Sequence, residues 1–161
     1  MKVITAPDIY NPSDDEIILF LAGGITGCPD WQSEVIGRLK RTKNLDRLVV
    51  YNPRRENFPI GDPNAAEEQI TWEYRYLSKC DIFSMYFCAG ESDQPICMYE
   101  LGRYGSGWGN IPVISVEDGY KRAKDVQIQI KLALNSDSWI HMNADPVKHT
   151  EEIIRTYNLF K

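Results

Sequence analysis

Glu100 stands where the pattern of its helix would place an apolar side chain. The stretch SDQPICMYELGRYG at 92–105 predicts a helix that begins near Pro95. Glu100 comes four residues after Ile96 and four before Tyr104, so the three side chains share a face. A carboxylate costs free energy to bury unless it is paired or hydrogen-bonded. The position is therefore a candidate for chemistry, such as nucleophilic attack or proton transfer.

Glu73 interrupts a second helical stripe in the same way. It lies three residues after Ile70 and four before Leu77. The alternative for both glutamates is a small outward rotation and an ion pair with a basic residue nearby. The available partners are Arg103 for Glu100, and Arg75 or Lys79 for Glu73.

The composition of the chain predicts a single domain over residues 1–161. Of its 161 residues, 43% are hydrophobic and 25% are charged, which allows a sizeable core. The formal net charge of −5 argues against a surface for nucleic acid, which needs clustered Lys and Arg. The basic run RLKRTK at 38–43 is short and is typical of the solvated end of a helix. We therefore expect no nucleic-acid polymer as a partner.

The sequence contains neither a targeting or membrane segment nor a metal-binding motif. Residues 1–16 lack a long apolar stretch, and no later run approaches the ~20 apolar residues of a membrane span. Cys28, Cys80, Cys88 and Cys97 form no C-x-x-C pair, and only two histidines could join them. We expect a cytoplasmic protein with free thiols, without membrane contact, and without a metal or organic cofactor.

Apolar runs and helical stripes alternate five times along the chain. The runs predict strands and the stripes between them predict helices. The expected strands lie at 16–24, 47–53, 80–88, 110–116 and 138–142, and the expected helices near 31–39, 70–77, 92–105, 121–134 and 146–157. This alternation predicts an α/β fold with a five-stranded parallel sheet and helices on both faces. The simplest doubly wound arrangement has the strand order 2-1-3-4-5.

In such a sheet the ligand crevice lies at the carboxyl ends of strands 1 and 3. Four segments reach it: AGGITG at 22–27, YNPRR at 51–55, CAGESDQPICMYE at 88–100, and the helix start TWEY at 71–74. Asp81 begins the third strand at the opposite end, so we expect it to be structural. Gly23 and Gly24 would let a ligand lie against backbone N–H groups, although a simple tight turn would use the same residues. AGGITG lacks the first glycine of the dinucleotide fingerprint.

Other residues near the crevice could bind a substrate. Asn52 offers both a donor and an acceptor, and Arg54 and Arg55 could hold a phosphate or a carboxylate. Trp72 and Trp31 could stack on a planar base, although aromatic residues at such positions also belong to cores.

Four segments resemble the nucleoside 2-deoxyribosyltransferase family, particularly its shorter 2-deoxyribosyltransferase-like branch. They are FLAGGITG with the following WQ, VVYNPRR, ITWEYRYLSKCDIFSMYF and DQPICMYELGRYG, and the similarity spans about residues 17–116. The E-L-G ending on the helix after the third strand is the most specific element. The resemblance implies a flavodoxin-like fold and transfer of 2-deoxyribose between nucleobases. It also implies a Glu nucleophile that forms a covalent deoxyribosyl intermediate.

The resemblance assigns roles to particular residues. The Glu of YELG, the implied nucleophile, is Glu100. The acidic residue eight positions before Asp81 is Glu73, where the family more usually has Asp. The position six before the nucleophile, which contacts the base or a phosphate, is Gln94, with Asp93 beside it.

The glycines that end the first strand of the family match Gly23 and Gly24. The chain departs from the family pattern at two positions. Phe20 stands where deoxyribosyltransferases often have a Tyr that orients the nucleophile, and Gln94 stands where many members have Asp.

The residue types also fit a retaining glycosyl transfer on chemical grounds. An anionic oxygen beneath C1′ stabilises the oxocarbenium-like centre and can then bond to it, which suits Glu100. Glu73 or Asp93 could supply a proton to the departing nucleobase. A second nucleobase or water would then take the sugar, giving transfer or hydrolysis.

Two alternatives stay open beside a nucleoside 2-deoxyribosyltransferase. One is a 2′-deoxynucleoside 5′-monophosphate N-glycosidase, in which Arg54, Arg55 or Ser92 would hold the phosphate. The other is a non-catalytic nucleotide-binding module. An NADP-dependent reductase fits less well, because the glycine fingerprint is incomplete.

The resemblance implies a homo-oligomer, because members of the family commonly assemble as dimers, tetramers or hexamers in which a neighbouring chain completes the pocket. The segments GSGWGN at 105–110 and TYNLFK at 156–161 could form that contact, although core packing would explain them as well.

Overall fold

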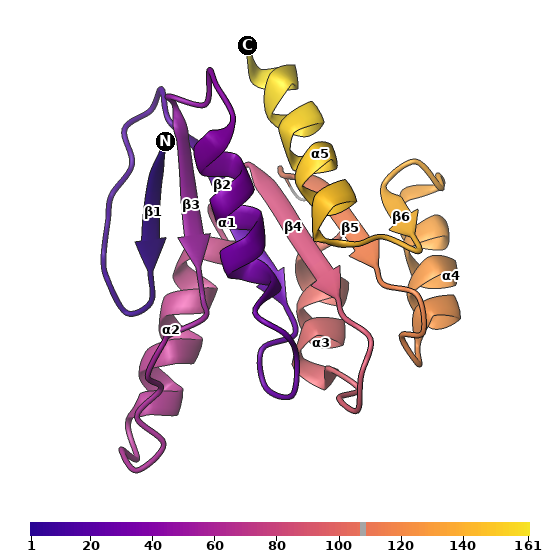
Figure 1. The fold of residues 1–161 in the computed structure, drawn as a ribbon, viewed down its shortest axis with the longest axis horizontal. Coiled ribbons are helices and arrows are strands. Elements are labelled where there is room, and N and C mark those ends of the chain that lie inside the picture. Colours follow the sequence, from indigo (N-terminus) through magenta and orange to yellow (C-terminus); the bar gives the residue numbers. More distant parts are fainter. Residues whose placement is uncertain (107–108) are drawn as a thin grey trace.

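A computed structural model describes residues 1–106 and 109–161 of the chain. Their strands form one sheet in the order β1-β3-β2-β4-β5-β6, and all neighbours are parallel (Figure 1). The strands are β1 (Lys2–Thr5), β2 (Ile17–Gly23), β3 (Leu48–Asn52), β4 (Ile82–Phe87), β5 (Ile111–Val116) and β6 (Ile140–Met142). Because every strand runs in the same direction, all carboxyl ends lie at one edge, the lower edge of the sheet in Figure 1.

The five expected strands are present in the expected relative order, but the expected number of strands is wrong. A sixth strand, β1, pairs with the outer side of β3, with Val3 opposite Val50. It has four residues and none of them is fully buried, as befits a sheet edge. The β-branched residues of KVIT are a strand signal, but a run of four gives no measurable alternation.

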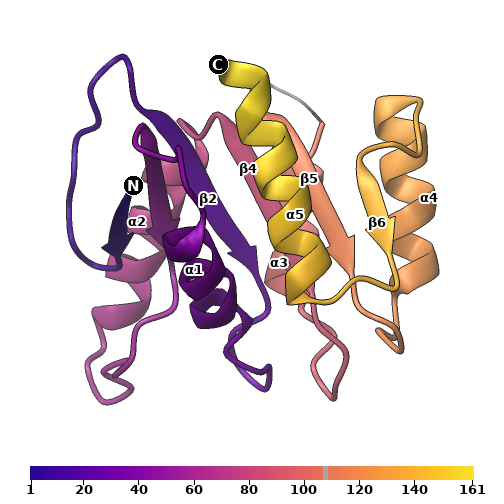
Figure 2. The ribbon, with the colours of Figure 1, turned by 45° about the horizontal axis from the view of Figure 1, so that its top comes forward.

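The helices cover both faces of the sheet. They are α1 (Trp31–Arg41), α2 (Ala65–Leu77), α3 (Pro95–Tyr104), α4 (Ala123–Leu134) and α5 (Pro146–Tyr157), followed by a 3₁₀ turn η1 (Asn158–Phe160). Figures 1 and 2 show α1 and α5 on one face and α2, α3 and α4 on the other. Among the helices within the described ranges, none is both long and apolar enough to cross a bilayer.

Each face of the sheet has its own core. On one face Trp31, Val35 and Leu39 of α1 pack beside Ile153 and Tyr157 of α5. On the other face the core includes Trp72 and Tyr76 of α2, Leu101 of α3, and Val126 and Ile130 of α4. The central strands are covered on both sides, which explains why β2 and β4 read as continuous apolar runs.

Polar side chains fix the ends and the docking of several elements. The Asp81 carboxylate accepts a hydrogen bond from the Ile18 amide at 2.7 Å, at the edge opposite the crevice, so the structural role expected for Asp81 is confirmed. His149 of α5 is fully buried and hydrogen-bonds to Ser84 Oγ and Ser115 Oγ, each at 2.7 Å. Burial lowers the pKa of His149 to about 3, so the imidazole that docks α5 onto the sheet is neutral.

The segment between β1 and β2 braces α2 against the edge of the sheet. The indole N–H of Trp72 donates to the Asp8 carbonyl at 2.8 Å. The hydroxyls of Tyr51 and Tyr76 both donate to the Tyr10 carbonyl, and the two rings stack with centroids 3.9 Å apart. These contacts hold α2, and therefore Glu73, against β3.

The stripe that predicted α2 faces the core only at its last residue, Leu77. Ile70 and Tyr74 are 64% and 52% exposed, whereas Trp72, Tyr76 and Leu77 are buried. Glu73 therefore lies on the border between the core face and an exposed face of the helix. The spacing identified the residues that share a face but not the face that meets the sheet.

Candidate active site

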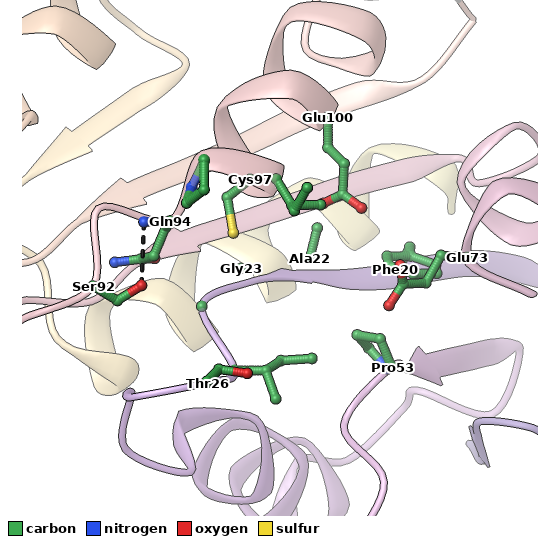
Figure 3. Close-up of a pocket in the computed structure, with 14 residues that line it drawn as sticks. Phe20, Ala22, Gly23, Thr26, Pro53, Glu73, Ser92, Gln94, Cys97 and Glu100 are labelled. Atoms are coloured by element: carbon green, nitrogen blue, oxygen red, sulfur yellow. Dashed lines mark hydrogen bonds between the residues drawn. The ribbon is translucent and has the colours of Figure 1, made fainter. Parts of the chain in front are cut away.

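A cavity opens at the carboxyl edge of β2 and β4, where sheet topology predicted the crevice. Its walls come from β2 and the loop behind it, from Pro53 after β3, from Glu73 on α2, and from the start of α3 with the loop before it. Figure 3 shows these side chains gathered around the end of β2. The topology brings four segments that are distant in sequence to one place.

Glu73 and Glu100 both line this cavity. Figure 3 shows the Glu100 side chain descending from α3 toward the side where Glu73 and Phe20 lie. Both glutamates also line an adjoining hollow between α2 and α3. The structure therefore brings together the two residues that sequence analysis selected as carboxylates for catalysis.

The ion pairs considered for these glutamates do not form in the described part of the chain. Arg103 donates to the Tyr99 hydroxyl, and Arg75 donates to Asn11 Oδ1. Neither Glu73 nor Glu100 has a basic partner within 4.0 Å among the described residues. Two half-buried carboxyl groups thus share a cavity without a neutralising cation in contact.

This environment changes the proton affinity of both groups. Burial, with a further contribution from the charge of Glu73, raises the pKa of Glu100 to about 8. Burial also raises the pKa of Glu73, against the opposing effect of a hydrogen bond from Gln69. Because the two groups interact, they titrate as a pair. The raised pKa of Glu100 favours its protonated form near neutral pH, which puts a transferable proton in the cavity.

Gln69 is a residue at this site that sequence analysis missed. Its Nε2 donates to Glu73 Oε1 and to the Pro53 carbonyl, both at 2.8 Å. The i, i+4 spacing of Gln69 and Glu73 was a signal that could have found the first contact. The second contact joins α2 to the end of β3, which only the folded chain reveals.

Gly23 and Gly24 line the cavity; the backbone at Gly23 requires glycine, and neighbouring side chains leave little room for a Cβ at Gly24. Gly23 has φ +147°, and a Cβ there would lie 2.3 Å from the Tyr86 carbonyl oxygen. A Cβ on Gly24 would lie 2.4 Å from Cys28 Sγ and 2.6 Å from Gln94 Oε1. The Gly24 N–H donates to the Tyr86 carbonyl at 3.3 Å. Close packing of the chain against itself therefore accounts for both glycines.

Gln94 also lines the cavity, at the start of α3. It adopts a left-handed conformation with φ 50° and ψ 54°, uncommon for a residue with a side chain. Its Nε2 donates to the Cys88 carbonyl at 2.7 Å, and its backbone N–H donates to Ser92 Oγ at 3.2 Å (Figure 3). Its Oε1 is buried without a partner among the described residues. These contacts fix the turn between β4 and α3.

Arg54 holds the loop behind β2 and does not line the cavity. Its Nη2 donates to the Pro29 carbonyl at 2.8 Å and lies 3.3–3.4 Å from three further carbonyls of residues 24–28. Its Nε donates to Gln32 Oε1 at 2.8 Å, and Asp30 lies 3.4 Å away. The guanidinium expected at a substrate is instead occupied by the protein.

The other candidates for binding also lie outside the cavity. Asn52 is buried and its Oδ1 accepts from the Arg54 amide at 3.1 Å. Trp72 is 5% exposed in the core beneath α2, and Trp31 is 2% exposed in the opposite core.

The two charged candidates also contact other parts of the protein. Asp93 is exposed, and its carbonyl accepts from Tyr120. Arg55 donates to Glu68. Among the described residues, none of these five contributes to the cavity wall.

Several wall residues were not among the candidates for binding. They are Phe20, Ala22, Ile25, Thr26, Pro53, Pro95, Ile96 and Cys97. Their positions at strand ends and at the start of α3 were the available signal. Ser92, which was considered for a phosphate, also lines the wall. Phe20 is fully buried and packs on Trp72 with ring centroids 5.8 Å apart, so this position offers Glu100 no hydroxyl.

Over residues 1–106 and 109–161, no group of three or more His, Cys, Asp or Glu side chains is arranged to hold a metal ion.

The site agrees with the comparison of the chain with known protein families. Residues 16–120 match the family model described as "Nucleoside 2-deoxyribosyltransferase like". The matched region is about two thirds of the 161 residues and contains the whole cavity wall. A comparison with curated proteins finds no significant match.

Proposed function

Because the chain belongs to the nucleoside 2-deoxyribosyltransferase-like family, we propose that it cleaves the N-glycosidic bond of 2′-deoxynucleosides and transfers the sugar to another nucleobase. One observation carries this proposal: Glu73 and Glu100 meet in one cavity at the carboxyl edge of the sheet, without a cation in contact among the described residues. A desolvated carboxylate pair is the arrangement that a retaining glycosyl transfer needs.

Because the raised pKa of Glu100 favours its protonated form, the first half-reaction begins when Glu100 gives its proton to Glu73. Glu100, now ionised, attacks C1′ of the bound deoxynucleoside. A bond forms between the carboxylate oxygen of Glu100 and C1′ while the C1′–N bond breaks. The electron pair of the C1′–N bond leaves with the nucleobase. The proton held by the carboxyl pair passes from Glu73 to the nucleobase. Such a proton transfer is worth about 10²–10⁴ in rate. The low local dielectric strengthens the attraction between Glu100 and the developing cation.

In the second half-reaction, another nucleobase attacks C1′ from the face that the first one vacated. The ester bond to Glu100 breaks, and the proton of the incoming base returns to Glu73. Two inversions at C1′ restore the original β configuration. A cavity that admits nucleobases but holds water away from the ester favours transfer over hydrolysis.

The function can be tested with deoxynucleosides, with and without an acceptor base. We expect exchange of the nucleobase by the parent protein and a loss of at least about 10³-fold in Glu100→Gln, because the amide cannot form the ester. Mass spectrometry with a 2-fluoro-deoxynucleoside should detect a sugar adduct on a peptide that contains Glu100. Glu151→Gln, on the exposed side of α5, serves as the matched control.

Three outcomes would contradict the proposal. They are absence of turnover in the parent protein, an adduct on another residue, and activity that survives in Glu100→Gln. Ligand binding without turnover in the parent would favour the non-catalytic nucleotide-binding module.

A 2′-deoxynucleoside 5′-monophosphate N-glycosidase is the second candidate function. Ser92 and the N-terminus of α3 form one end of the cavity, and a helix N-terminus favours a phosphate. Arg54 and Arg55 are engaged with other groups of the protein, which weakens the role considered for them. Free deoxyribose phosphate released from a deoxynucleotide without acceptor base would favour this hydrolase.

We also propose that the protein is a homo-oligomer with an interface beside the cavity. Ile70 and Tyr74 of α2 and Ile96 and Tyr99 of α3 are each more than half exposed around the hollow that adjoins the two glutamates. The cavity measures about 190 Å³, below the ~300–1,000 Å³ of complete ligand pockets, so a second copy has room to complete it.

Two other segments were considered for this contact from the sequence. Tyr157 of TYNLFK is buried in the core. The centre of GSGWGN, residues 107–108, lies outside the described residues.

A further inference from the structure

We propose that Gln69 is a positioning residue that fixes the Glu73 carboxylate against the cavity wall by bridging it to the backbone of Pro53. The effect of Gln69 on turnover rests on the proposed function. The effect of Gln69 on the Glu73 carboxyl group does not.

The orientation of the Gln69 amide follows from its two contacts. Nε2 lies 2.8 Å from Glu73 Oε1 and 2.8 Å from the Pro53 carbonyl oxygen, and an amide nitrogen has two protons to donate. If the amide were flipped, its oxygen would face two other acceptors. The amide therefore clamps the carboxylate to a backbone atom at the end of β3.

The amide keeps this orientation at a cost to its own oxygen. Gln69 Oε1 is buried and has no hydrogen-bond partner within the described residues. A buried polar atom without a partner is uncommon in proteins and calls for a reason. A purely space-filling role would be served better by an apolar side chain of similar shape. The two donated hydrogen bonds supply the reason.

The clamp also divides the tasks of the two oxygens of Glu73. Oε1 accepts the amide proton, and no hydrogen bond to Oε2 is present in the part of the chain that the structure describes. Oε2 is therefore the atom free to carry a proton, while Oε1 keeps its bond in either protonation state. A fixed carboxyl group delivers its proton along one direction, which matters because small displacements reduce rates strongly.

Other titratable groups surround Glu73 on the elements packed against α2. Those that line the cavity or the adjoining hollow with it are Glu100, Cys97, Tyr99, Arg103, Tyr104 and, on α2 itself, Tyr74. Burial opposes ionisation of Glu73, the donor of Gln69 favours it, and the charge of Glu73 in turn opposes ionisation of Glu100. Removing the donor should therefore make Glu73 harder to ionise.

The test compares the parent protein with Gln69→Leu, which removes both hydrogen bonds. A ¹³C-NMR titration of the carboxyl groups, assigned with Glu73→Gln, should show the midpoint of Glu73 raised by about 0.5–1 pH unit in Gln69→Leu. For turnover we expect kcat to fall about 10–100-fold with KM changed less than about threefold. Gln129→Leu makes the same change at an exposed position of α4 and should alter neither measurement.

The outcomes separate this inference from the proposed function. If Gln69→Leu is folded and titrates and turns over like the parent, the inference is wrong while the function stands. If the parent shows no turnover, the function fails, and the titration still decides the role of Gln69. If Gln69→Leu does not fold by circular dichroism, Gln69→Met takes its place, and an unchanged Glu73 midpoint in that variant overturns the inference.

Discussion

At the scale of single residues, the site depends most on the proton affinity of Glu100. An exposed glutamate ionises near pH 4.5, whereas burial and the charge of Glu73 raise the pKa of Glu100 to about 8. Between about pH 4.5 and pH 8, Glu100 therefore keeps its proton in the folded chain and releases it in the unfolded chain. Strained or costly groups of this kind concentrate at functional sites.

Glu100 links the stability of the fold to pH. Because the folded state binds the proton more tightly, its stability falls as pH rises from about 4.5 to about 8. Gln cannot ionise, so Glu100→Gln should be more stable than the parent at pH 9, by up to about 5 kcal/mol, with the advantage vanishing near pH 4. Urea unfolding at several pH values measures this difference.

The matched control for this experiment is Glu151→Gln, an exposed glutamate on α5. Its difference from the parent should stay within about 0.5 kcal/mol at every pH. A stability gain of Glu100→Gln that does not grow between pH 5 and pH 9 would show that Glu100 ionises normally in the folded protein.

At the scale of elements, Arg54 joins the end of β3 to the loop behind β2. Its planar guanidinium contacts the carbonyls of Gly24 and Pro29 and the amide of Gln32 at once. Lysine has one nitrogen and cannot reproduce this fork. We expect Arg54→Lys to lose about 1–3 kcal/mol of unfolding free energy, because buried carbonyls lose their donor.

The loop that Arg54 holds forms one wall of the cavity, so a loss of activity should accompany the loss of stability. Arg54→Lys should raise KM more than it lowers kcat, since the change loosens a wall and leaves both carboxyl groups in place. Thermal unfolding and steady-state kinetics measure the two effects. Arg41→Lys, exposed in the last turn of α1, is the control. Unchanged kinetics in Arg54→Lys would mean that the loop keeps its shape without the guanidinium.

The elements also show how far the sequence could predict this site. The alternation of apolar runs with helically spaced apolar residues predicted five strands, five helices and the sheet edge where the cavity lies, because topology follows from element order. It missed β1, since four residues are too few to establish a period. Helical spacing grouped Ile70 with Glu73 and Ile96 with Glu100, but burial of Trp72 and Leu101 decided which face meets the sheet.

The directions of the side chains at the strand ends could not be predicted from the sequence. Asn52 and Arg54 follow β3 at the expected edge, yet both turn to backbone groups of the protein. Their direction depends on which unpaired carbonyls and amides lie near in the folded chain. The same limit explains why the sequence could place Gln69 one turn before Glu73 but could not reveal its contact with Pro53.

At the scale of the whole molecule, the exposed apolar side chains between α2 and α3 predict self-association. Light scattering after size-exclusion chromatography should give a mass of at least twice 18.5 kDa at about 10–100 μM protein. The double variant Ile70→Lys and Tyr74→Lys should shift the mass toward the monomer, because like charges would meet across the contact.

Leu132→Lys provides the control for this experiment. Leu132 is 74% exposed on α4, away from the cavity, and its replacement should leave the mass unchanged. A parent protein that stays monomeric at 100 μM, or a double variant with the parent's mass, would mean that the apolar hollow is not an interface between copies.

All wall residues of the cavity lie between Phe20 and Glu100, so β1 at one end of the chain and α4, β6 and α5 at the other contribute none of them. The two ends of the chain thus support the cavity without lining it. For protein engineering, this separation makes the two ends of the chain suitable places to attach tags, reporters or tethers.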